Sequence, residues 1–444
     1  MSFFKKLFSS SSENNTDDSS SNLNERSFGR YTEVNKTSSQ LVYWSKALDE
    51  FSQKKYIDSF NSLLLYMLDP KINNVKINKN AENIVFEIIQ GSKIIRGKAD
   101  NKTFEAEAMI ARFDKLSVAF LRKLMGMNFI NQYTRFAIKD DIIYLKFDSN
   151  TIDASPNKVY FSIKELSLKS DKLDDSLIDE FESLHPVDCG HIIELDNNIK
   201  EIKYKYLIKW INDTLNKVYE LNEDRMSGGI SYMLLALIFR IDYLLQPQGT
   251  LFDAIDKING IYNAKDNKTT LERNRLMIEE LKKILNKPKD DIISNFYDVK
   301  TTFGYVPVTS HKQFYEFILE QFKNTGWYYE NKYDGIVTSI YEWVIGYSLF
   351  YFGLYPATYD LLKIAYMILQ PDFFKEMGIT LNLNNSNTNI INKAALDKEI
   401  QKVIKNYIKH YPKLTVMVQN INCRTMNEFL YTFLNEITYL NFSK

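Results

Sequence analysis

The sequence predicts an α+β domain, an antiparallel sheet with flanking helices, followed by an all-α helical domain. Short apolar runs separated by turn residues fill the first part of the 444 residues, and apolar residues at helical spacing fill the second part. A chain of this length also exceeds the roughly 100 to 200 residues of one ordinary core. We therefore predict a disordered tail over residues 1–38, the α+β domain over 39–185 and the all-helical domain over 186–444.

Composition and charge exclude several classes of protein. The chain is 45% apolar and 14% aromatic, and its 56 basic residues balance its 56 acidic residues. No long run of like charges occurs, so we expect neither nucleic acid nor an anionic membrane as a partner. Two apolar stretches, residues 232–245 and 340–355, contain charged residues or glycines and fall short of the roughly 20 residues that span a bilayer. We predict buried helices there and no transmembrane segment.

The cysteine count and the first residues predict a cytoplasmic protein. Only Cys189 and Cys423 occur, far apart in the sequence, which favours a reducing compartment. The N-terminal residues lack the apolar core and cleavage site of a signal peptide. Residues 9–38 are rich in Ser, Asn and Asp and cannot offset the entropy of ordering. The apolar residues within 3–8 form either a short amphipathic turn or a frayed terminus.

The α+β domain begins with two expected helices and continues with strands. Apolar residues recur at helical spacing over residues 41–68, with a break at Lys54 and Lys55 and an end at Pro70. Strand-forming runs follow at residues 84–89, 93–96 and 104–111. Turn residues separate these runs, so they predict an antiparallel meander.

A helix, a hairpin and a last helix complete this domain. Residues 116–127 have helical spacing, with Val118, Leu121, Leu124 and Met125 expected on one apolar side. The hairpin is predicted from two strand-forming runs, residues 134–138 and 142–147, around a tight turn at 139–141. The last helix is expected over about residues 157–181.

Part of this domain resembles a known family. The residues that carry the resemblance are 121–128, Tyr133, Phe136, Ile138, Asp140, Asp141, the strand 142–147 and the helix at 173–177. Together with the order of elements, they resemble the YbjN-type relatives of type III secretion chaperones over roughly residues 40–185. The resemblance implies a small α/β sandwich whose exposed sheet or helix surface binds a polypeptide, often as a dimer, with no catalytic residue. We expect no cofactor. More than half of the chain lies outside it, so a secretion-chaperone role is not inherited automatically.

Beyond Pro186 the pattern is helical almost to the end of the chain. The expected helices cover residues 204–221, 230–245, 270–285, 312–322, 337–352, 357–369 and 398–411. Residues 346–365 resemble one tetratricopeptide helix pair, but such units need about three stacked copies, so we interpret them as a simple packed pair. Gly228 and Gly229 precede an apolar helix and favour a turn over an anion site. The Asn-rich residues 382–389 are the longest candidate loop.

One segment has the residue types that bind metals. His185, Asp188, Cys189 and His191 lie close together, and imidazoles, thiols and carboxylates are the ligands that zinc prefers. A closed site needs four ligands, and the remaining histidines and Cys423 lie far away and singly, so we favour a linker without metal. A nucleophilic role for Cys189 is also disfavoured, because its neighbouring histidines in the same loop cannot act as its base.

Aromatic residues are dense between residues 314 and 366. Tyrosine and tryptophan dominate interface hot spots, although most buried aromatic residues only fill a core. A group in a predicted loop after residue 326, and two residues of the segment with the family resemblance, are the best candidates for contact with a partner. These candidates are Trp327, Tyr328, Tyr329, Tyr333, Tyr133 and Phe136.

Three classes of function remain. No phosphate-binding loop, dinucleotide fingerprint, nucleophile elbow or zinc-peptidase helix occurs in the sequence. The leading hypothesis is therefore a non-catalytic protein that holds another protein, as a chaperone or adaptor does, and a homodimer is one form of it. The alternative is an enzyme with a pocket in the helical domain, in which Glu330, Asp334, Glu342 and His311 supply acid and base. A structural subunit of a larger assembly is the third hypothesis.

Overall fold

The computed structural model of this chain describes residues 28–34, 36–304, 306–307, 309–385 and 390–443. They form two compact units, which we call the sheet unit and the helical unit. The sheet unit consists of residues 36–193 and 298–304; the helical unit consists of residues 28–34, 194–297 and the described residues after 305. The predicted fold class, an α+β part followed by an all-helical part, is confirmed.

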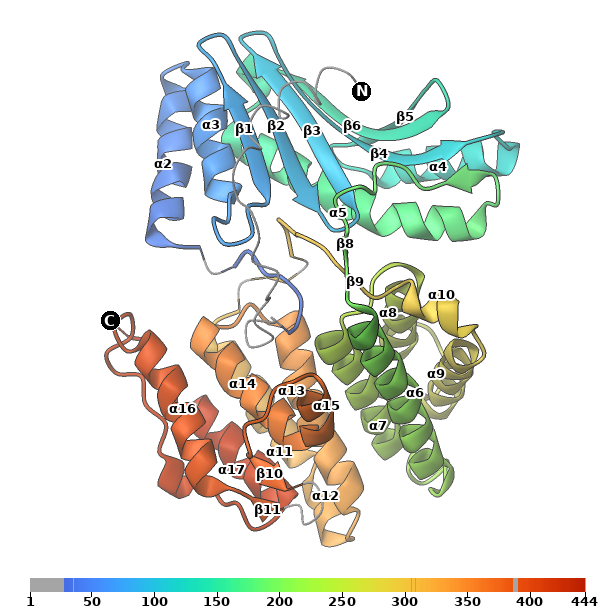
Figure 1. Cartoon of the computed structure of the whole chain (residues 1–444), viewed down its shortest axis with the longest axis vertical. Coiled ribbons are helices and arrows are strands. Elements are labelled where there is room, and N and C mark those ends of the chain that lie inside the picture. Colours follow the sequence, from blue (N-terminus) through green and yellow to red (C-terminus); the bar gives the residue numbers. More distant parts are fainter. Residues whose placement is uncertain (1–27, 35, 305, 308, 386–389, 444) are drawn as a thin grey trace. The chain divides into compact units, whose positions relative to one another are not determined.

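The sheet unit contains one antiparallel sheet and helices α2 to α5 (Figure 1). The helices are α2 (Ser38–Ser52), α3 (Tyr56–Met67), α4 (Val118–Ile130) and α5 (Pro156–Glu180), with a 3₁₀ turn at Thr151–Asp153. The strands are β1 (Val75–Lys79), β2 (Asn83–Gln90), β3 (Lys93–Asp100), β4 (Thr103–Phe113), β5 (Arg135–Lys139), β6 (Ile142–Asn150) and β7 (Leu184–His185). The strand β8 (Ile193–Glu194) ends this part of the chain.

The sheet has the order β1-β2-β3-β4-β6-β5, and β7 pairs with β4. The expected meander and hairpin are both present, with Ile88 opposite Ile95 and Ile138 opposite Ile143. Gly91 and Asp140 each have φ of 55°, as tight hairpin turns require. The sequence therefore determined the antiparallel pairing through its turn residues.

One face of the sheet packs against α3 and α5 and forms the core of this unit. The Phe60 ring on α3 meets the Phe104 ring on β4 at a centroid distance of 5.0 Å. Phe86 on β2 is paired with Gly97 on β3, and a Cβ atom at Gly97 would lie 2.0 Å from Phe86 Cζ. Gly97 is therefore needed because the Phe86 ring occupies the space of its side chain.

Residues 298–304 join the sheet unit from far along the chain. The Thr302 hydroxyl donates to the Ile89 carbonyl at 2.7 Å, and Gln90 Oε1 accepts from the Phe303 amide at 2.9 Å. The Phe303 ring is buried in the core beside Tyr160. This segment therefore satisfies hydrogen-bonding groups of the last residues of β2.

The helical unit consists of helices with a few two-residue strands (Figure 1). Its first helices are α6 (Asn197–Tyr219), α7 (Ser227–Arg240), α8 (Gly249–Asn263), α9 (Thr270–Leu285) and α10 (Lys289–Ile293), with a π-helical turn at Ile241–Leu245. Its later helices are α11 (His311–Lys323), α12 (Gly326–Glu330), α13 (Asp334–Tyr351), α14 (Pro356–Leu369), α15 (Pro371–Glu376), α16 (Lys393–Tyr407) and α17 (Met426–Thr438), with a 3₁₀ turn at Val418–Asn420. The short strands are β9 (Tyr297–Asp298), β10 (Asn384–Asn385) and β11 (Ile390–Ile391).

Helices α7 and α13 pack along each other at the centre of the helical unit. A Cβ atom at Gly346 on α13 would lie 2.6 Å from Phe239 Cβ on α7 and 2.7 Å from the Tyr366 hydroxyl on α14, so only glycine allows this approach. Residues 227–245 are long and apolar enough for a membrane span by length and composition, yet 83% of the tested window is buried within the fold. The central helix of a folded core has the same properties.

Several elements differ from the sequence-based expectation. Strand β1 and helices α8 and α17 were not expected, and α12 forms where a loop was predicted. Part of the predicted tail, residues 28–34, is placed in the helical unit, and the units divide after residue 193 rather than 185. Gly228 and Gly229 lie in the first turn of α7. The expected amphipathic turn at residues 3–8 lies outside the described residues.

Candidate protein-binding surfaces

The outer side of helix α4 is apolar and exposed. Val118, Met125 and Phe129 keep 67%, 71% and 93% of their surface accessible, and Ile130 at the helix end keeps 70%. Val118, Arg122, Met125 and Phe129 lie along one side of the helix, three or four positions apart. We call these four residues the α4 stripe. Exposed contiguous apolar residues of this size mark interaction surfaces more often than isolated ones do.

The inner side of α4 fixes the direction in which the stripe faces. The Ser117 hydroxyl accepts from the Phe120 amide and caps the helix. Phe120 and Leu124 are buried in the core, and the Phe120 ring meets Phe181 at 5.0 Å. Lys123 forms an ion pair with Glu180 on α5. The helix is therefore held from one side, and the stripe must face away from the core.

The sequence did not identify the stripe. Val118 and Met125 were expected on the same apolar side as Leu121 and Leu124, but only Leu124 of these four is fully buried. Helix α4 has three polar residues among thirteen, so its periodicity cannot choose a buried side, and the packing of Phe120 decides it.

The edge strand β5 lies beside α4. The Phe136 amide donates to Asn128 Oδ1 of α4 at 2.7 Å, and the Ile138 side chain is 41% exposed. Phe136 itself is only 8% exposed and belongs to the core, and Tyr133 is half-buried against the same core. Of these two candidates, Phe136 is therefore a core residue, and Ile138, two residues further along the same strand, is exposed.

Glu165 on α5 holds the loop between α4 and β5. Its carboxylate accepts from the amides of Gln132, Tyr133 and Thr134 at 2.9, 2.7 and 3.1 Å, and from Lys169 Nζ at 2.8 Å. Burial opposes ionisation, but these donors outweigh it and lower the pKa of Glu165. The loop that carries Tyr133 is thereby fixed to α5.

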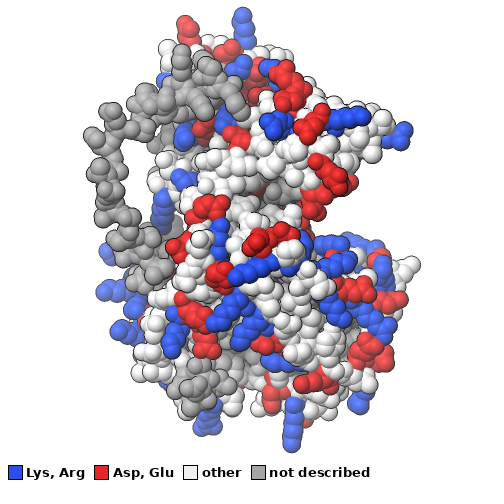
Figure 2. All heavy atoms as spheres, turned by 45° about the vertical axis from the view of Figure 1, so that its right-hand side comes forward, with Lys and Arg blue, Asp and Glu red and all other residues white. Residues whose placement is uncertain are grey.

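The face of the sheet opposite α5 carries charges rather than an apolar platform. Cross-strand ion pairs join Lys76 to Glu87, Arg96 to Glu87, Lys98 to Glu105 and Lys146 to Glu107. Basic and acidic side chains are likewise interleaved over the side of the molecule drawn in Figure 2. Charged side chains are depleted at the centre of protein interfaces, so this face is a weaker candidate than the α4 stripe.

The aromatic group near residue 327 is partly exposed. Trp327 and Tyr329 keep 48% and 58% of their surface accessible, and the rings of Trp327 and Tyr333 stack at 5.9 Å. Tyr328 is half-buried: its ring lies against the start of α7, where a Cβ atom at Gly229 would be 3.2 Å away. Burial raises the pKa of Tyr328. Trp327 and Tyr329 are the members of this group that face solvent.

The side chains of the segment with metal-binding residue types contact different partners and do not converge on one point. His185 Nε2 lies 2.6 Å from Asp114 Oδ2, Asp188 pairs with Arg96, and His191 Nε2 donates to the Gly91 carbonyl at 3.1 Å. Within the described part of the chain, no group of three or more His, Cys, Asp or Glu side chains could hold a metal ion. These residues attach the end of this segment to the sheet.

The four residues of the enzyme hypothesis do not converge. Glu342 is buried in an ion pair with Arg240, and His311 Nε2 donates to the Thr438 carbonyl at 2.9 Å. Burial lowers the pKa of His311, although that hydrogen bond opposes the shift. Glu330 and Asp334 are exposed. The geometry provides no shared centre for acid–base catalysis.

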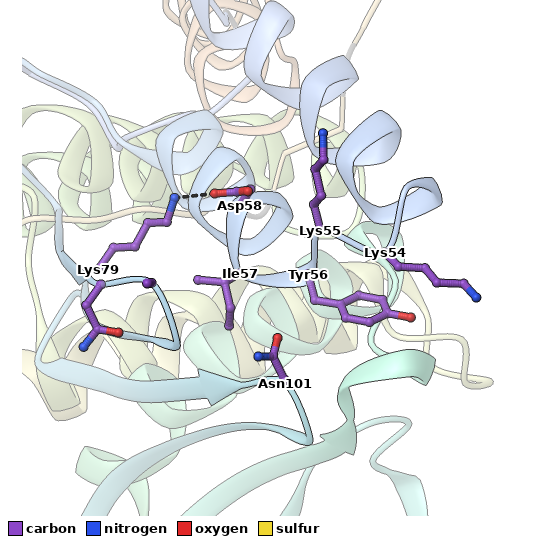
Figure 3. A pocket seen from close by; sticks show the side chains of 9 residues that line it. Lys54, Lys55, Tyr56, Ile57, Asp58, Lys79 and Asn101 are labelled. Carbon is purple, nitrogen blue, oxygen red and sulfur yellow. Dashed lines mark hydrogen bonds and ion pairs between the residues drawn. The ribbon is translucent and has the colours of Figure 1, made fainter.

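The sheet unit also has a shallow polar hollow (Figure 3). It lies between the start of α3 and the strand turns, and its lining residues include Lys54, Lys55, Tyr56, Lys79 and Asn101. Its one acidic side chain, Asp58, is engaged with Lys79. Figure 3 shows the Lys54 and Lys55 side chains directed outward from the hollow rather than toward a common point.

Comparison with known proteins found no family model and no curated protein that matches this chain.

Proposed function

We propose that this protein binds another protein without catalysis, as a chaperone or adaptor does, and that the α4 stripe is its main contact surface. The observation that carries the proposal is the exposure of Val118, Met125 and Phe129 on a helix whose opposite side is fixed in the core. Burying each of these side chains would contribute about 1.5–3 kcal/mol. This is the scale of an interface anchor.

The stripe also defines what the partner must offer. Ala119 and Gly126 lie exposed beside it, and a Cβ atom at Gly126 would meet nothing within 4 Å, so a partner backbone can approach closely. Arg122 favours a carboxylate on the partner. The occupant is therefore an apolar segment with at least one acidic residue.

This proposal agrees with the resemblance of residues 40–185 to YbjN-type relatives of secretion chaperones. We further propose a cytoplasmic location, since the sequence contains only two cysteines, Cys189 and Cys423, which lie far apart in the sequence and form no disulfide bond with each other, as a reducing compartment favours. A second copy of the chain is one form of the proposed partner, and a different protein is the other.

Site-specific photocrosslinking tests the proposal. A benzoylphenylalanine at Met125 of the full chain, expressed in its own cells, is expected to yield one discrete adduct. The matched control is the same residue at Lys98, on the charged face of the sheet, where no such adduct is expected. Mass spectrometry of the adduct separates a homodimer from a complex with a different protein. Equal labelling at both positions, or none at Met125, would overturn the role of α4.

A further inference from the structure

The helical unit contains a short segment that is separated from its helices in the sequence by residues 36–193 of the sheet unit. Residues 28–34 have neither helical nor strand structure and lie in the helical unit, whereas the next residues, from Lys36, belong to the sheet unit. The continuous chain of the helical unit begins only after residue 193. Residues 28–34 therefore lie on these helices as a bound peptide does.

Arg30 is the charged anchor of this segment. Its Nε donates to Asp242 Oδ1 at 2.7 Å, and its Nη2 donates to the Pro247 carbonyl at 2.8 Å. The guanidinium carbon also lies 4.1 Å from the centre of the Phe252 ring. Asp242 is 4% exposed within the π-helical turn Ile241–Leu245. A buried carboxylate without a charged partner would destabilise the fold, so this site favours a cationic side chain in the segment that it binds.

Gly29 is the conformational anchor. Its amide donates to the Tyr243 carbonyl at 2.9 Å, and its carbonyl accepts from Gln246 Nε2. Its φ is +80°, and a Cβ atom would lie 2.6 Å from Tyr243 Cε2. Both the backbone conformation and the available space therefore select glycine at this position.

Phe28 is the apolar anchor. Its ring meets Phe374 at 5.1 Å and Phe373 at 6.2 Å in edge contacts, and Lys363 Nζ lies 5.2 Å from its centre. Three consecutive residues thus make an aromatic contact, a backbone contact at a position closed to side chains, and an ion pair with a buried carboxylate. Contacts of these three kinds distinguish one peptide sequence from another, whereas a purely apolar contact would accept many sequences.

We propose that the surface of the helical unit that contacts residues 28–34 is a peptide-recognition site for an extended aromatic-Gly-Arg segment. Residues 28–34 are its resident occupant, and a partner polypeptide with the same three features displaces them. The site is separate from the α4 stripe and does not depend on the function proposed for it. A tethered occupant acts at an effective concentration on the order of millimolar, so the resident segment hides the site from weaker ligands. The chain therefore responds only to a partner that matches this sequence well.

Fluorescence anisotropy with a labelled peptide of residues 26–35 tests the site. The full chain with Phe28→Ala and Arg30→Ala is expected to bind the peptide at least tenfold more tightly than the wild-type chain does. Peptides with Gly29→Ala or Arg30→Ala should each lose at least tenfold in affinity. These peptide changes leave the folded chain untouched. A double variant that still unfolds cooperatively but binds no peptide, or that binds the Gly29→Ala peptide equally well, overturns the proposal.

A second measurement keeps the test decisive if the double variant does not fold. A protease recognition sequence inserted at Asn35 of the otherwise wild-type chain allows the resident segment to be separated from residues 36–444. After cleavage, the labelled peptide is expected to replace the released fragment, as seen by native mass spectrometry. A fragment that remains bound and never exchanges with excess peptide would show a structural strap and overturn the proposal.

Discussion

Arg240 and Glu342 form a two-bonded ion pair in the middle of the helical unit. Arg240 Nε and Nη2 each donate to one carboxylate oxygen of Glu342 at 2.6 Å, across 102 residues of sequence. Glu342 is 3% exposed, and the Arg240 guanidinium carbon also lies 5.4 Å from the Trp210 ring centre. The pair joins α7 to α13, the two central helices.

Removing one partner of this pair should destabilise the helical unit strongly. Glu342→Ala leaves the Arg240 charge buried without its partner, so we expect a loss of about 3–5 kcal/mol in the free energy of unfolding. Urea unfolding followed by tryptophan fluorescence measures it. The double change Arg240→Met with Glu342→Leu should cost less than Glu342→Ala alone, because it removes both charges. Glu316→Ala, which breaks the exposed pair with Lys312, is the control and should cost less than about 1 kcal/mol.

The two sides of α4 should respond differently to substitution. Phe129→Asp changes a side chain that is 93% exposed, so we expect unfolding free energy to change by less than about 0.5 kcal/mol. Phe120→Ala removes a buried ring and should cost about 3–5 kcal/mol. The same Phe129→Asp chain should lose the crosslink at Met125. If Phe129→Asp unfolds the protein, the ring is a core residue and the assignment of the outer side is wrong.

Two glycines should show opposite effects on replacement by alanine. Gly97→Ala places a Cβ atom in the space of Phe86 Cζ and should cost about 1–3 kcal/mol through overpacking. Gly126→Ala on α4 meets nothing within 4 Å and should stabilise the sheet unit by up to about 1 kcal/mol through helix propensity. Thermal unfolding of both variants measures the difference. Equal effects of the two substitutions would contradict the close approach of Phe86.

Glu165 should make the stability of the sheet unit depend on acid pH. Its pKa in the folded protein lies below the ordinary value of 4.5, so its contribution is complete above pH 4.5 and is lost as the pH falls through the folded-state pKa. Glu165→Gln lacks this contribution at every pH. The difference in unfolding free energy between the wild-type and variant chains should therefore be constant above about pH 4.5 and shrink below it. A difference that grows toward acid pH would contradict the four hydrogen bonds to this carboxylate.

The local elements could be predicted because their signals are local. Gly91 and the 139–141 turn determined which strands pair, and the break at Lys54, which has φ of 61°, separates α2 from α3 as expected. Strand β1 was missed because only Val75 among its five residues is buried, so it lacks an apolar pattern. Backbone pairing with β2, rather than an apolar pattern of its own, holds this segment as a strand.

The candidate surfaces could be predicted only in part. The exposed Trp327 and Tyr329 were recognised from their residue types, whereas Phe136 proved to be a core residue. The exposure of Phe129 could not be read from the sequence, because an apolar helix has no polar side to mark its outside.

The sequence by itself determined the fold class, the meander and the helical character of the second part, since each depends on residues a few positions apart. Only the tertiary structure decided the relationships across long separations: Phe303 within the core of the sheet unit, Arg30 on Asp242, and Arg240 on Glu342. These contacts depend on which surfaces complement one another after the helices have formed. No periodicity along the chain encodes that choice, because side chains a hundred or more residues apart meet through shape and charge alone.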